Sequence, residues 1–159
     1  MIPFRNEPLT NFSVAENRAA MQTALTRVSK QFGRTYPLVI EGKAITTEVT
    51  RPSVNPCNHQ EVVGIVAQGN SEHAEQALHA AWDAFASWSR VPMPVRADYL
   101  FKLAAIMRRQ KSELTAWLIM EVGKNWVEAD ADVAEAIDFC EYYARQAVKL
   151  SNGTTPIAL

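Results

Sequence analysis

From Ser71 to about Leu150, apolar residues recur at the three- and four-residue spacing of amphipathic helices. Pro92, Pro94 and Gly123 interrupt this stretch, so we expect several helices rather than one. The expected ranges are about 71–88, about 95–110, a helix or kinked continuation from Ser112 to Gly123, and about 126–150. A chain with this pattern folds mainly through helix packing.

Each expected helix has an apolar face. In the first, with Ser71 as the expected N-cap, the face is Ala74, Ala77, Leu78, Ala81, Trp82, Phe85 and Trp88. In the second it is Leu100, Leu103, Ala104 and Met107. In the last it is Val133, Ile137, Cys140, Ala144 and Ala147. We expect the Trp and Phe side chains of the first face to lie in a core or an interface, because burying one of them stabilises a fold by about 1.5–3 kcal/mol.

The first 70 residues have a different pattern. After an irregular start at 1–11, Ser13 is the expected N-cap of a helix that ends near Phe32, before Gly33. Short runs rich in β-branched residues at 38–40 and 44–47 predict a hairpin. We then expect an extended piece bracketed by Pro52 and Pro56, followed by a strand at 61–67. The expected fold is α+β and mainly α, a helical bundle with a small β-hairpin region. Its segments are about 1–33, 34–70 and 71–152.

Charge and composition exclude several classes of protein. The 16 basic and 17 acidic residues give a net charge of −1, so nothing indicates a nucleic-acid partner or an anionic membrane surface. No apolar run approaches the roughly 20 residues of a membrane span. The N-terminal residues predict neither a secretory signal nor a transit peptide. We therefore expect a cytoplasmic protein.

The glycines argue against a complete dinucleotide-binding unit. A phosphate-binding turn needs closely spaced glycines, whereas the 6 glycines here are dispersed. They are Gly33, Gly42, Gly64, Gly69, Gly123 and Gly153. No βαβαβ alternation is visible either, so we expect a Rossmann core to be absent.

The cysteines and histidines give little sign of chemistry. Cys57 and His59 could begin a metal site, but no further ligand is near them in sequence, and we favour a structural role. Cys140 is expected in the core, because its helix neighbours are apolar. His73 and His79 do not share a helix face, so we expect solvated surface residues.

An acidic run opens the last helix. It consists of Glu128, Asp130, Asp132, Glu135 and Asp138. Negative charge near a helix N-terminus interacts favourably with the helix dipole, so a solvated helix start explains these residues without a ligand. Glu135 is the possible exception. Further along, Glu141 and Arg145 are spaced to form an ion pair worth about 0.3–0.5 kcal/mol.

Several motifs together resemble one known family. The stretch from Glu121-Val-Gly-Lys to Tyr142-Tyr-Ala-Arg is similar to the aldehyde dehydrogenase superfamily. Ala134-Glu-Ala-Ile-Asp-Phe139 resembles its 1-pyrroline-5-carboxylate dehydrogenase branch. Weaker matches are Arg96-Ala-Asp-Tyr-Leu, Ala104-Ala-Ile-Met-Arg-Arg, Ser53-Val-Asn-Pro, Glu61-Val-Val-Gly and Phe4-Arg-Asn-Glu-Pro. The last resembles the start of stand-alone members, so we expect no fusion with another proline-degrading enzyme.

The resemblance implies an NAD-dependent oxidation of glutamate semialdehyde to L-glutamate. In this family a cysteine thiolate attacks the aldehyde, hydride passes to the nicotinamide, and a glutamate activates water. The resemblance places all these catalytic groups beyond Leu159, and Cys57 and Cys140 match none of them. We therefore expect an incomplete N-terminal portion of the fold that is inactive alone and binds no NAD.

The resemblance carries over one binding residue. Glu135 matches a family glutamate on a helix that borders the substrate pocket, where a carboxylate can meet the substrate's α-ammonium group. Alternatively, Glu135 is one more surface acid of an acidic helix.

Two functions remain open at this point. The chain is either part of a longer dehydrogenase or a non-catalytic helical module that associates with one. As partners we expect the remainder of the dehydrogenase or a homo-oligomer, bound through exposed apolar surface.

Overall fold

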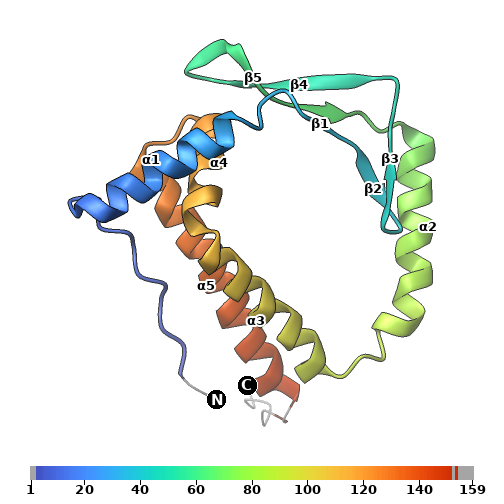
Figure 1. Ribbon diagram of the computed structural model, residues 1–159. Coiled ribbons are helices and arrows are strands. Elements are labelled where there is room, and N and C mark those ends of the chain that lie inside the picture. The colour runs from blue at the N-terminus through green and yellow to red at the C-terminus, as the bar shows by residue number, and fades with distance from the viewer. Residues whose placement is uncertain (1–2, 152, 154–159) are drawn as a thin grey trace, which may run out of the picture.

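The computed structural model describes residues 3–151 and 153 (Figure 1). The helices are α1 (Ala15–Ser29), α2 (Ser71–Trp88), α3 (Met93–Arg109), α4 (Lys111–Val122) and α5 (Trp126–Ser151). The strands are β1 (Thr35–Tyr36), β2 (Leu38–Ile40), β3 (Lys43–Ile45), β4 (Thr50–Asn55) and β5 (Asn58–Ala67). The chain is mainly helical with small sheets, which confirms the expected fold class. No helix among the described residues is long and apolar enough to cross a bilayer.

The strands form two small sheets. β2 and β3 make the expected antiparallel hairpin, joined by Glu41 and Gly42 at φ 54° and 72°. Positive φ at both central residues gives the turn the twist that adjacent strands require. The second sheet has the order β1-β5-β4, with β4 antiparallel and β1 parallel to β5. The sequence did not predict β1, because two residues that pair far along the chain leave no local pattern.

Two N-caps differ from those expected. Ser13 does not cap α1; its hydroxyl donates to Asn11 Oδ1 at 2.7 Å, and Val14 is the N-cap without a side-chain bond. Asn70, not Ser71, caps α2, because Asn70 Oδ1 accepts from the His73 N–H at 3.0 Å. His73 Nδ1 accepts from the Asn70 N–H in return, at 3.2 Å. His73 is therefore a half-buried capping residue and not the solvated one that we expected.

The buried side chains form two clusters. The first joins Met21, Ala24 and Val28 of α1 to Ala116 of α4. The second joins Ala104 of α3 to Val133 and Ile137 of α5, with Cys140 packed against it. The apolar face expected for the last helix is thus confirmed at these positions. In α3, Ala104 of the expected apolar face is buried, whereas Leu103 of the same face is 44% exposed.

The aromatic face of α2 is not part of either cluster. Figure 1 shows α2 on the opposite side of the molecule from α3 and α5, with strands passing between the two sides. No residue of α2 is buried. Its large apolar side chains are exposed: Leu78 by 54%, Trp82 by 65%, Phe85 by 57% and Trp88 by 43%. Of the two roles expected for this face, the core role is therefore wrong within the described residues. The interface role stays a prediction.

Candidate functional site

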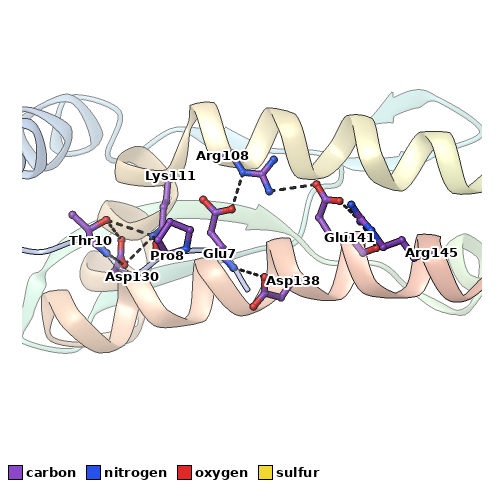
Figure 2. Close-up of polar contacts among 9 residues, drawn as sticks. All are labelled: Glu7, Pro8, Thr10, Arg108, Lys111, Asp130, Asp138, Glu141 and Arg145. Atoms are coloured by element: carbon purple, nitrogen blue, oxygen red, sulfur yellow. Dashed lines mark hydrogen bonds and ion pairs between the residues drawn. The ribbon is translucent and has the colours of Figure 1, made fainter. Parts of the chain in front are cut away.

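Residues 128–141 of α5 carry its acidic side chains, and the structure gives them different surroundings. Asp130 is only 3% exposed and accepts three hydrogen bonds. These come from the Thr10 N–H at 2.8 Å, the Thr10 hydroxyl at 2.7 Å and Lys111 Nζ at 3.0 Å (Figure 2). The expectation of a solvated acid is wrong for Asp130. Its carboxylate is instead a structural junction between α4, α5 and the N-terminal segment.

Asp138 holds the same N-terminal segment two helical turns further on. One oxygen accepts from the Glu7 N–H and the other from Asn6 Nδ2, both at 2.7 Å. The Glu7 carboxylate in turn accepts from Arg108 Nε at 2.7 Å (Figure 2). That bond is the main reason why the pKa of Arg108 lies above its ordinary value. Asp138 therefore also has a structural partner.

Two further acids of α5 are paired. Asp132 accepts from Lys124, in the turn that joins α4 to α5. Glu141 pairs with Arg145 as the spacing predicted, and with Arg108 Nη2 at 3.3 Å. Charge pairing within the fold thus explains these two side chains without any ligand.

Glu135, like Glu128, is not paired within the described part of the fold. Its side chain is exposed, and among the described residues it has no ion pair or hydrogen bond. Phe139 and Tyr143 follow at the i+4 spacing of one helix face, 51% and 56% exposed. Their rings stack with centroids 5.9 Å apart. Glu135 therefore presents a free carboxylate next to an exposed aromatic pair, an arrangement suited to a ligand with an ammonium group.

The cysteines and histidines do not assemble a reactive centre. Cys57 is exposed in the turn between β4 and β5, and burial raises the pKa of the Cys140 thiol, which disfavours a thiolate. In the described part of the chain, no three His, Cys, Asp or Glu side chains cluster as metal ligands. The Cys57 and His59 pair thus has no third ligand among those residues.

The described residues do not form a cradle for NAD. Such a cradle needs a parallel β-α-β unit with a glycine turn at the helix N-terminus. The parallel pair β1 and β5 is short, and β5 is followed by Gln68-Gly69-Asn70 without a second nearby glycine. The candidate site among the described residues is the α5 surface around Glu135.

Fold and sequence together define the class of protein. The aldehyde dehydrogenase family model matches residues 44–158, and the chain belongs to that family. Among solved structures it resembles the 1-pyrroline-5-carboxylate dehydrogenase from Thermus with bound NAD, with TM-score 0.91 and 54% identity over 94% of this chain. It also resembles proline utilization A from Bdellovibrio bacteriovorus, with TM-score 0.94 and 39% identity over 99% of this chain.

The curated relatives indicate the same branch. The 1-pyrroline-5-carboxylate dehydrogenase of Geobacillus kaustophilus is 55% identical over 151 residues, or 95% of this chain. That match covers 29% of the relative, and the Thermus match also covers 29%. The Bdellovibrio match covers 16% of its chain. The chain is therefore similar to one part of much longer enzymes.

Proposed function

We propose that this chain supplies the N-terminal portion of an NAD-dependent dehydrogenase. The reaction is the oxidation of glutamate semialdehyde, the open form of 1-pyrroline-5-carboxylate, to L-glutamate in proline degradation. The observation that carries the proposal is the match to the Geobacillus kaustophilus enzyme, 55% identical over 95% of this chain. The NAD-bound Thermus structure, at 54% identity, supports NAD as the cofactor of the assembled enzyme. A cytoplasmic location remains a prediction.

In this proposal the chain contributes to substrate binding and not to the chemical step. Its thiols are poor candidates for a nucleophile, since Cys140 has a raised pKa and the Cys57 thiol has no hydrogen-bonded base or cation among the described residues. Glu135 would accept a charge-assisted hydrogen bond from the substrate's α-ammonium group. Paired neighbours support this role, because Asp132 and Asp138 are occupied within the fold whereas Glu135 is free among the described residues.

The α2 face supports the proposed partner. Trp82 and Phe85 are 65% and 57% exposed, and their rings pack edge to face with centroids 6.0 Å apart. Exposed aromatic clusters of this kind mark interaction surfaces in proteins. The remainder of a dehydrogenase, which makes up most of each relative's length, is the occupant we propose for it. A non-catalytic module docked on a complete enzyme is the competing function.

A chimera tests the proposed function directly. This chain would replace the matching 29% of the Geobacillus kaustophilus enzyme, and NAD reduction with 1-pyrroline-5-carboxylate would be followed spectroscopically. We expect activity within about tenfold of the parent enzyme, a cost of ~1.4 kcal/mol or less. A well-folded chimera that binds NAD but does not turn over would contradict the proposal. It would favour the non-catalytic module.

The same chimera tests Glu135. Loss of one charge-assisted hydrogen bond, worth about 1.5–3 kcal/mol, should raise KM roughly 10- to 100-fold in Glu135→Gln and change kcat less. Glu128→Gln is the matched control, because Glu128 is another exposed acid of α5, about 10 Å away along the helix axis. Equal KM values for the two variants would remove Glu135 from the substrate site and leave the proposed function standing.

A further inference from the structure

The N-terminal segment, residues 3–12, has no helix or strand, yet it is held at a defined place. We call this segment the arm. Aromatic contacts hold both of its ends. Phe4 lies edge to face with Tyr142, with ring centroids 5.5 Å apart, and Phe12 lies edge to face with Trp126, with centroids 5.4 Å apart. Between these ends the arm is fastened to α3, α4 and α5 by charged side chains (Figure 2).

The inner fastening is buried. It consists of Thr10, Lys111 and Asp130, with side-chain exposures of 12% for Lys111 and 4% for Asp130. Lys111 Nζ also donates to the carbonyl of Pro8 at 2.9 Å. Two donors of Thr10 and one of Lys111 therefore converge on a single shielded carboxylate.

The outer fastening is less shielded than the inner one, because its cation is exposed. It consists of Asn6, Glu7, Arg108, Asp138 and Glu141. The Arg108 side chain, which joins the two glutamates, is 43% exposed, whereas the side chains of Glu7 and Glu141 are 10% and 17% exposed. Dissolved ions can therefore reach its contacts to Glu7 at 2.7 Å and to Glu141 at 3.3 Å from the side of the guanidinium group.

Dissolved salt acts unequally on the two fastenings. The Debye length falls from about 10 Å at 0.1 M to about 3 Å at 1 M ionic strength, and this weakens exposed charge pairs. Buried pairs are screened much less. The outer fastening should therefore weaken with salt over a range in which the inner one keeps its strength.

We propose that the arm acts as a strap that detaches from the helices in steps, beginning at its N-terminal end. The outer fastening opens as ionic strength rises, while Thr10 stays bound to Asp130 and the helices stay folded. Opening frees the carboxylate of Asp138, which lies three residues from Glu135 on α5. The strap thereby controls whether solvent and ligands reach a second carboxylate beside Glu135. This inference concerns the isolated chain and holds whether or not Glu135 meets a substrate.

Two backbone amides report the two fastenings separately. The Glu7 N–H donates to Asp138 and the Thr10 N–H donates to Asp130, so each amide exchanges with solvent only when its own fastening opens. Residue-resolved hydrogen exchange of the full chain would be measured at 0.1 M and at 1 M salt, at constant pH. We expect the Glu7 amide to exchange about tenfold faster at 1 M, a factor that corresponds to ~1.4 kcal/mol, and the Thr10 amide to change less than about twofold.

A variant pair tests the ionic origin. Glu7→Gln should accelerate exchange at residue 7 at low salt and remove most of its salt dependence. Asp98→Asn is the control, because it removes another exposed ion pair of α3, Asp98 with Lys102 at 2.7 Å, that does not touch the arm. Equal protection and equal salt dependence at Glu7, Thr10 and Ile137 would overturn the proposal, because the arm would then open only with the whole fold. Faster exchange at Thr10 than at Glu7 would overturn it as well.

Discussion

Asp130 and Glu135 are two acids of one helix, five residues apart, with opposite surroundings. Asp130 is 3% exposed and bound by Thr10 and Lys111, whereas Glu135 is exposed and unpaired among the described residues. Helical geometry turns residues five positions apart to different faces, so only one of them meets α4 and the arm. The buried residue is therefore a structural one, and the exposed residue is the candidate for binding.

At this scale we predict that Asp130→Ala destabilises the fold strongly. It would leave Lys111, only 12% exposed, without its carboxylate partner. Breaking a buried pair from one side costs about 3–5 kcal/mol, so the midpoint of urea unfolding should fall markedly. The control is Asp98→Ala, whose side chain is 55% exposed and should change stability by less than about 1 kcal/mol. Similar unfolding midpoints for both variants would contradict a buried junction at Asp130.

At the scale of elements, the turn between α4 and α5 depends on one residue. Gly123 ends α4 with φ 76°, in the left-handed region that side chains adopt at a cost. A Cβ at this position would lie 2.9 Å from Cγ of Pro56 in the turn between β4 and β5. The helix turn therefore packs closely against the sheet as well as reversing the chain.

We predict that Gly123→Ala is more destabilising than Gly42→Ala. Gly42 has a similar φ of 72°, but a Cβ there would meet nothing within 4 Å. Strain alone should cost about 1–2 kcal/mol at Gly42, and overpacking against Pro56 should add roughly 1–3 kcal/mol at Gly123. Denaturant unfolding of the two variants measures the difference. Equal losses would mean that Pro56 moves aside freely.

At the scale of the whole molecule, the apolar surface is unusually open. The α2 face contributes Leu78, Trp82, Phe85 and Trp88, all more than 40% exposed. On the other side of the molecule, Phe139 and Tyr143 of α5 are exposed too. Exposed apolar side chains of this size often mark interaction sites, and the partner proposed above would cover them.

We predict that the isolated chain self-associates as its concentration rises. Replacing Trp82 and Phe85 with Gln should reduce the associated fraction. Sedimentation velocity would follow both proteins. Val49→Ser is the control, because Val49 is 65% exposed but lies outside α2. A wild-type chain that remains monomeric at high concentration would count against an uncovered interface. It would favour an adapted module.

Much of the fold follows from local sequence. Helix spacing, the breaks at Pro92 and Gly123, and the turn at Gly42 predicted most helices and the first hairpin to within a few residues. These signals are local because backbone conformation and turn geometry depend on near neighbours. The family was also recognisable from short motifs, and Glu135 was singled out from one of them.

Tertiary contacts decided the rest. The helical pattern of α2 and that of α5 look alike in sequence, yet Ile137 is buried and Trp82 is 65% exposed, because burial depends on which element packs opposite. Similarly, no local pattern indicates that Asp130 meets Thr10, 120 positions away. The sequence by itself determined where helices and turns form. Only the tertiary structure decided which apolar faces meet and which carboxylates are paired, since both depend on residues that are distant along the chain.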